Sequence, residues 1–109
     1  MDTIAPMIAI YTTIASKQSA YMLANEAIAQ KRAACVNIIP HIESIYEYSD
    51  ECHHDNEIGM IFKTSNAQKE NLCAWIENHH PYECPAIIIL ASEASNSFVQ
   101  WIEKTLEQQ

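Results

Sequence analysis

Hydrophobic and polar positions alternate along three stretches of the chain, residues 7–14, 35–49 and 57–64. A period of two is typical of β-strands with one buried and one wet face. In the second stretch the apolar row consists of Val36, Ile38, Ile42, Tyr46 and Tyr48. Pro40 interrupts this stretch, and proline cannot donate to a strand ladder, so it predicts an edge position or a bulge. Residues 86–91 are continuously apolar, which predicts a strand that is central in a sheet or covered on both faces.

Three further segments repeat apolar residues at helical spacing. The first, 17–32, follows a possible N-cap at Ser16. The second begins after Ser65 and Gln68, which have the form of a capping box, and Pro81 ends it near His79 or His80. Its apolar stripe consists of Leu72, Trp75, Ile76 and His79. The third, with a possible cap at Ser97, has the stripe Phe98, Trp101, Ile102, Thr105 and Leu106.

The predicted order is therefore β-α-β-β-α-β followed by one more helix, with residues 50–56 as a polar hairpin connection. This order predicts an α+β fold, a ferredoxin-like sandwich with an added C-terminal helix. The length of 109 residues predicts a single domain over 1–109, with its core at about 7–106. The two crossover helices would cover one sheet face. The other face must be wet, covered by the last helix or buried against another subunit, and Ile39 and Ile45 on that face favour the subunit.

The net charge of the chain limits which kinds of molecule it is expected to bind. Fourteen acidic residues stand against six basic ones, with a formal net charge of −8. Nucleic acids and anionic membranes are therefore not expected as partners, because both need clustered Lys and Arg. The first residues are typical of a strand rather than a signal peptide, and no apolar run reaches the roughly 20 residues of a membrane span. We therefore expect a cytoplasmic protein with four reduced cysteines.

Three motifs occur together in one order: "KRAACVNIIPHIESIY" (31–46), "EIGMIFKT" (57–64) and "HHPYECP" (79–85). With them the chain resembles the CutA divalent-cation tolerance family over roughly residues 7–106. The resemblance implies a ferredoxin-like subunit in a tight, PII-like homotrimer, a link to copper and other divalent cations, and a bacterial cytoplasmic location. No reaction is well attributed to that family, so the resemblance implies that the chain is not an enzyme. The chain departs from the family's "Y-x-W-E-G-K" hairpin, with Tyr48 in place of Trp and Asp50 in place of Gly.

The segment "NHHPYECP" (78–85) is the main candidate site. In some relatives copper is ascribed to two adjacent histidines and a cysteine, and these positions correspond to His79, His80 and Thr12 here. Threonine is a poor copper ligand, and adjacent histidines on a helix diverge by about 100°. His79 and His80 are thus either a metal site for copper or another divalent cation, or structural residues, with His79 on the buried stripe. Tyr82 and Glu83, between two prolines, are candidates for an inter-subunit cleft.

A second segment rich in possible metal ligands, "ECHHD" (51–55), is a weaker candidate for a metal site. In an extended arm, Cys52 and His54 would point one way and His53 and Asp55 the other, giving two ligands per side. Zinc needs three or four, so we expect a solvated hairpin tip.

Three functions remain open from the sequence. The first is a trimeric cytoplasmic protein of the CutA type that acts in divalent-cation (copper) tolerance, by binding metal ions. The second is a PII-like signalling or scaffolding trimer that binds a small metabolite between subunits. The third, an enzyme with a site around Tyr82 and Glu83, lacks a positioned nucleophile and base.

Overall fold

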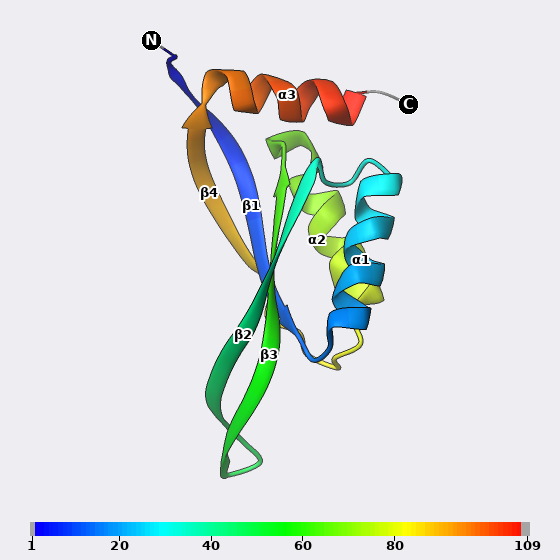
Figure 1. Cartoon of the computed structure of the whole chain (residues 1–109), viewed down its shortest axis with the longest axis vertical. Helices are drawn as coiled ribbons and strands as arrows, with labels where there is room; N and C mark the ends of the chain where they lie inside the picture. The colour runs from blue at the N-terminus through cyan, green and yellow to red at the C-terminus, as the bar shows by residue number, and fades with distance from the viewer. Residues whose placement is uncertain (1, 108–109) are drawn as a thin grey trace.

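A computed structural model describes residues 2–107. In this part of the chain, four strands form one antiparallel sheet in the order β2-β3-β1-β4 (Figure 1). The strands are β1 (Ile4–Ile14), β2 (Cys35–Tyr48), β3 (Glu51–Thr64) and β4 (Ile88–Ser95). The helices are α1 (Lys17–Ala29), α2 (Lys69–His79) and α3 (Asn96–Glu107), with a 3₁₀ turn η1 (Asn66–Gln68) before α2. The predicted order of strands and helices is confirmed.

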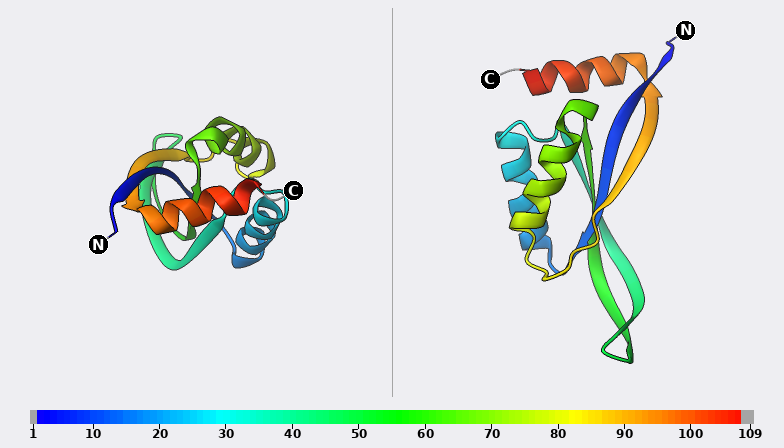
Figure 2. Two further views of the ribbon diagram at one scale, coloured as in Figure 1. Left: turned by 90° about the horizontal axis from the view of Figure 1, so that it is seen from above. Right: turned by 180° about the vertical axis from the view of Figure 1, so that it is seen from behind.

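The main core lies between the sheet and the helices α1 and α2, which run side by side on one face (Figures 1 and 2). Alternate residues of β1 enter this core, as the period of two predicts. Its largest fully buried apolar members are Ile10, Ile14, Met60, Phe62, Leu72 and Ile76. Helix α3 crosses one end of the sheet and closes a smaller cluster of Met7, Ala34, Val99, Ile102 and Leu106.

The caps of the helices follow the sequence only in part. Ser16 caps α1, because its Oγ accepts a hydrogen bond from the Ser19 backbone N–H at 3.2 Å. The predicted capping box at Ser65 is wrong, since the backbone carbonyl of Ser65 accepts from Gln68 N–H instead and closes the turn η1. The predicted cap at Ser97 is also wrong. α3 begins one residue earlier, and Ser97 donates from its backbone N–H and its hydroxyl to Asp2.

The hairpin between β2 and β3 is much longer than its polar sequence predicts. Residues 51–56 belong to β3 and are not a connection, so that prediction is wrong. The turn is only Ser49 and Asp50, both at positive φ (53° and 62°). A two-residue turn with both residues left-handed matches strand twist and keeps the two strands paired. Pro40 lies within a register shift between Ile39 and Ile42 on an edge strand, as predicted.

From Glu43 to Asn56 this hairpin forms an arm that extends beyond the rest of the molecule (Figure 1). β3 pairs with β1 only as far as Ile58, so the arm's two strands pair only with each other in the described chain. The arm accounts for the elongated outline, 49 × 29 × 22 Å. It carries exposed apolar groups, among them Ile45 and Tyr48.

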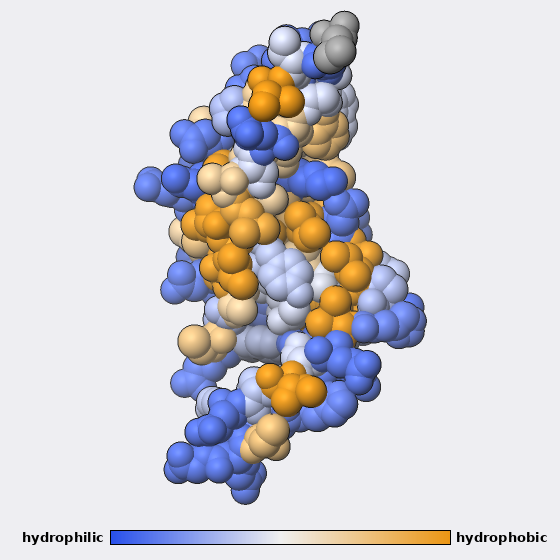
Figure 3. Space-filling view, turned by 90° about the vertical axis from the view of Figure 1, so that its left-hand side faces the viewer, coloured by the Kyte–Doolittle hydropathy of each residue, from blue (hydrophilic) through white to orange (hydrophobic). Residues whose placement is uncertain are grey.

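The sheet face away from α1 and α2, here called the open face, is apolar and largely uncovered. The register places on it Tyr11, Ile39, Ile61, Ile88 and Leu90. Figure 3 shows apolar side chains gathered in the middle of this side of the molecule. β4 is an edge strand, and its Ile88 and Leu90 are 47% and 45% exposed. The prediction that 86–91 is central or covered is therefore wrong for the single chain, because within residues 2–107 β4 lies at the sheet edge and Ile88, Ile89 and Leu90 are exposed.

Candidate functional site

The candidate site lies where α2 ends and the loop of residues 80–87 returns to the sheet. α2 ends at His79, as predicted, and His80 is already extended (ψ 137°) because Pro81 follows it. The two adjacent histidines therefore leave the helix in different directions.

His80 is buried and uses both ring nitrogens. Its Nε2–H donates to the backbone carbonyl of Thr13 at 2.8 Å, and its Nδ1 accepts from the Tyr82 backbone N–H at 3.1 Å. Only the neutral ring can satisfy both partners. Burial lowers the pKa of His80, although the Thr13 carbonyl and the charge of Glu57 act in the opposite direction. His80 thus fixes the loop to the end of β1, and no lone pair is left for a metal ion.

His79 is exposed, so its predicted place on the buried stripe of α2 is wrong. Its Nδ1–H donates to the Trp75 carbonyl one turn earlier, at 2.8 Å. The imidazole also stacks on the Trp75 indole, with ring centroids 4.7 Å apart. This places the ring outside α2, with Nε2 free of hydrogen bonds to residues 2–107.

Thr12 lies in the main core and is fully buried. Its hydroxyl makes one long contact, 3.5 Å, to the Thr13 carbonyl. A hydroxyl is a weak ligand for copper. Together, Thr12, His79 and His80 offer one free imidazole nitrogen, so this set does not fit a copper ion in the conformation described.

Tyr82 reaches from the loop to the base of the arm. Its hydroxyl donates to Glu57 Oε2 at 2.6 Å, and its ring packs edge-on against His80. Burial, followed by the Glu57 carboxylate, raises the pKa of Tyr82, which keeps the phenol protonated as a donor. Burial also raises the pKa of Glu57, but hydrogen bonds from Ser44, Tyr82 and Thr13 outweigh it and hold that pKa below 4.5. The result is a charged, half-buried carboxylate.

Glu57, rather than Glu83, is therefore the carboxylate that Tyr82 engages. Glu83 is exposed in the loop, and no side-chain hydrogen bond joins it to another described residue. Glu57 could not be recognised from the sequence, because it lies 25 residues from Tyr82 and belongs to an ordinary alternating stretch of β3. The two residues are not related by any local spacing in the sequence. They meet because the loop of residues 80–87 returns to the sheet beside β3.

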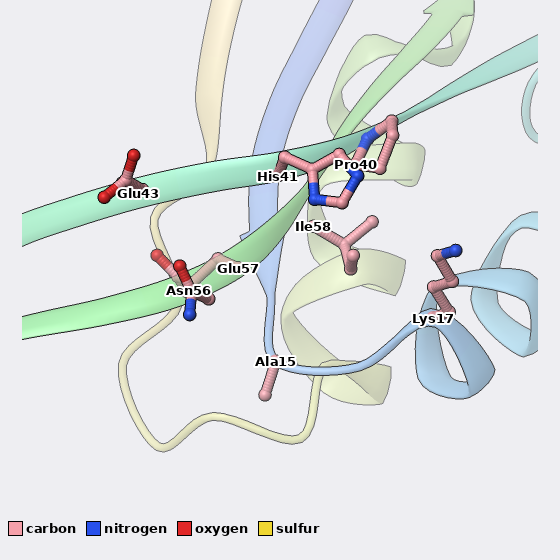
Figure 4. A pocket seen from close by; sticks show the side chains of 8 residues that line it. All are labelled: Ala15, Lys17, Pro40, His41, Glu43, Asn56, Glu57 and Ile58. Atoms are coloured by element: carbon pink, nitrogen blue, oxygen red, sulfur yellow. The ribbon is translucent and has the colours of Figure 1, made fainter.

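A cavity of about 370 Å³ lies at the base of the arm, beside Glu57 (Figure 4). Its lining comes from β2, β3 and the start of α1 and consists of Ala15, Lys17, Pro40, His41, Glu43, Asn56, Glu57 and Ile58. Cationic and anionic side chains thus share one space. His41 has a positive φ (63°) and lies in the register shift of β2 that borders the cavity.

The arm holds the second segment rich in possible metal ligands. Tyr46 and His53 stack, Tyr46 also bonds Asp55, and His54 Nε2 meets Glu43 Oε1 at 2.9 Å. These cross-strand pairs engage both histidines, and Cys52 is exposed. Within residues 2–107, no three His, Cys, Asp or Glu side chains converge so as to hold a metal ion. None of the helices in this part of the chain is long and apolar enough to cross a membrane.

Known proteins match the chain over almost its whole length. A family model described as "CutA1 divalent ion tolerance protein" matches residues 8–105. The protein "Protein CutA, chloroplastic" of Arabidopsis thaliana is 34% identical over 92% of this chain and 56% of its own length. The chain thus spans about three fifths of the first curated relatives it matches.

Two solved structures of similar proteins share the fold. The CutA1 of Ehrlichia chaffeensis has a TM-score of 0.87 at 34% identity, with 97% of each chain covered. The CutA of Synechococcus elongatus has a TM-score of 0.89 at 31% identity, over 97% of this chain and 94% of that one. By its sequence and by the arrangement of its strands and helices, the chain belongs to the CutA1 divalent ion tolerance family.

Proposed function

We propose that this chain acts as a non-enzymatic homotrimer in the tolerance of divalent cations, with the cytoplasm as its compartment. In this proposal each subunit is a ferredoxin-like sandwich and the assembly is PII-like. The observation that carries it is the apolar open face, bordered by the edge strand β4. The family match supports the link to divalent cations.

Physical reasons favour closure of this face on other copies of the chain. An edge strand with unpaired backbone groups and exposed Ile88, Ile89 and Leu90 invites uncontrolled pairing unless it is covered. Among residues 2–107 the two strands of the arm pair only with each other, and two-stranded hairpins are marginally stable in water. A symmetric assembly covers both features in every subunit.

A metal-binding role through the pair His79 and His80 receives less support. His80 holds the loop with both nitrogens, so only His79 is available as a donor from that pair. We therefore propose that cation tolerance does not depend on a two-histidine chelate for copper or another divalent cation. Replacing His80 is expected to harm folding more than metal binding.

The functional test is growth of a bacterial strain that lacks its own member of this family, in graded Cu²⁺ and Zn²⁺. Wild type is expected to raise the tolerated concentration, and the double variant Ile88→Asp/Leu90→Asp, which charges the open face, is expected to lose that effect. The matched control Tyr21→Asp changes an exposed residue of α1 and should keep it. Equal growth with wild type and with an empty vector would contradict the proposal.

A second candidate function has one specific observation in its favour. The cavity at the base of the arm combines Lys17 and His41 with Glu43 and Glu57, a set that suits a small polar metabolite. In this candidate function the chain is a PII-like signalling trimer, and the cavity at the base of the arm is its metabolite site. The test is a melting series: a metabolite that raises Tm where divalent ions do not, and loses the effect in Glu57→Gln, would favour this function.

A further inference from the structure

The arm is joined to the rest of the described chain, here called the body, through a narrow base (Figure 1). From Glu43 to Asn56 its two strands pair only with each other among residues 2–107. The side-chain hydrogen bonds of Tyr46, His53 and His54 also stay inside the arm. In the described chain, the direction in which the arm points is therefore set at its base.

The base has the features of a pivot. β2 shifts its register between Ile39 and Ile42, and His41 within the shift has a positive φ of 63°. Gly59, the only glycine of the chain, lies opposite on β3 and pairs with Ile39. A Cβ at Gly59 would lie 3.3 Å from Ile42 Cγ1 and 3.4 Å from Ile39 Cβ. Bulges bend a strand and glycine weakens one, so the two-stranded ribbon should bend most easily here.

One carboxylate beside this pivot ties the arm to the body. Glu57 follows the arm in β3, and its Oε2 accepts a hydrogen bond from the Tyr82 hydroxyl at 2.6 Å. Tyr82 belongs to the loop of residues 80–87 and thus to the body. Ser44 of the arm and Thr13 of β1 stabilise the same carboxylate. Three elements outside β3 therefore meet at one side chain.

The cavity of about 370 Å³ at the base of the arm has walls on both sides of the pivot (Figure 4). Ala15 and Lys17 belong to the body, whereas Glu43 and Asn56 belong to the arm. His41 of the pivot is part of the same lining. Because the two walls lie on either side of the pivot, a change in the direction of the arm would change the width of this cavity.

We propose that the arm is a hinged element, with its pivot at His41 and Gly59 and with the Tyr82–Glu57 hydrogen bond as the latch that holds its direction. Release of the latch lets the arm swing relative to the body and reshapes the cavity between them. This inference deepens the second candidate function, because a metabolite in the cavity would act on the direction of the arm, and it rests on that function for this meaning. The hinge itself is tested without any metabolite.

The test measures backbone amide residual dipolar couplings of the deuterated, ligand-free protein in its native oligomeric state. One alignment tensor is fitted to the sheet and helices of the body, and the couplings of arm residues 43–56 are compared with it. In the parent the latch is closed, so a single tensor should fit both parts. A parent arm that requires its own, weaker tensor would overturn the latch.

Tyr82→Phe removes the hydroxyl of the latch and keeps the ring. The arm couplings should then still fit the same hairpin, but with a tensor weaker than that of the body. The matched control is Tyr46→Phe, which removes a tyrosine–carboxylate hydrogen bond inside the arm and should leave the single tensor in place. A single tensor in Tyr82→Phe would overturn the proposal, and so would arm couplings that no longer fit a hairpin, since they would show unfolding instead of swinging.

The pivot is tested in the Tyr82→Phe background. His41→Gly removes the Cβ that restricts a residue at positive φ, so it should weaken the tensor of the arm further. No further loss would overturn the assignment of the pivot. An arm that swings while no metabolite raises Tm would count against the second candidate function alone. An arm that stays fixed in every variant would overturn the hinge and leave that function standing.

Discussion

At the residue scale, Tyr82 and Glu57 form the bond that joins the proline-bounded loop to the base of the arm. It is a charge-assisted hydrogen bond, because the pKa of Glu57 is low and that of Tyr82 is high. Ser44 and Thr13 also stabilise the carboxylate. The loop is thus positioned by one carboxylate far away in sequence, and the loss of one hydroxyl should be measurable.

We expect Tyr82→Phe to lower the free energy of unfolding by about 1 kcal/mol at neutral pH, since the pair is only half-buried. Because the pKa of Glu57 is lowered by folding, its contribution is present above 4.5 and is lost as the pH falls through the lower folded value. The difference between variant and parent should shrink there. Urea unfolding at a fixed protein concentration measures it, with Tyr21→Phe, an exposed tyrosine, as the control. An equal loss in the two variants would contradict the role of Glu57.

His80 gives a second pH-dependent prediction at this scale. Burial lowers its folded pKa below 6.5, so its contribution is complete above 6.5 and is lost as the pH falls from there toward the folded value. His80→Gln, which cannot take up a proton, should cost about 1–2 kcal/mol at pH 7.5. It should also flatten the fall in stability between neutral and mildly acidic pH. An identical pH slope in variant and parent would show that His80 is not the titrating group.

At the element scale, the arm depends on a turn in which Ser49 and Asp50 are both left-handed. Asparagine or aspartate followed by glycine is the preferred pair for such turns, because glycine has no Cβ to clash at positive φ. This chain has aspartate at the second position and forms the same turn at a conformational cost. The family's common glycine at that position is thus accounted for by backbone geometry.

Asp50→Gly should therefore stabilise the chain by about 0.5–1 kcal/mol. The control Glu47→Gly places glycine within the β2 strand of the same arm, where it should destabilise instead. Thermal unfolding of the three proteins at one concentration checks both signs. A lower Tm for Asp50→Gly than for the parent would contradict the turn geometry.

Elements with strong periodicity were the ones that could be predicted from sequence. The alternation of Ile8, Ile10 and Ile14 identified β1, and Pro81 placed the end of α2. The start of β3 was missed because residues 51–56 are polar and look like a loop; in the arm they are strand residues without a core that would require apolar side chains. For β4, the prediction failed because a continuous apolar run is compatible both with a buried strand and with an edge strand that is exposed in the single chain.

The segment 79–85 was chosen from the sequence as the candidate site, but its contacts were not predicted. The segment 79–85 is indeed the corner of the fold, yet which histidine is buried depends on where the helix ends, and that is uncertain by a residue from sequence alone. Glu57 carries no local signal, because it joins the site through a tertiary contact with Tyr82. Sequence periodicity predicts which side of a helix or strand is buried, but it does not predict which residues of two different elements come into contact.

At the scale of the whole molecule, the proposed assembly depends on one surface, the open face. The open face and edge strand β4 expose Ile88 and Leu90, and the arm extends away from its own core (Figures 1 and 3). Assembly would bury these groups, and burial of apolar surface stabilises by roughly 25 cal/mol per Å². Stability should then depend on protein concentration, because the folded subunit and its assembly are linked by mass action.

The most direct test is sedimentation velocity at low micromolar concentration, on the parent chain and on Leu90→Asp. As a homotrimer, the parent should sediment with about three times the 12.4 kDa mass of one chain. Leu90→Asp, which places a charge on the open face without touching the main core, is expected to shift the population toward single, folded chains. A parent protein that sediments as a stable single chain of 12.4 kDa would contradict the account.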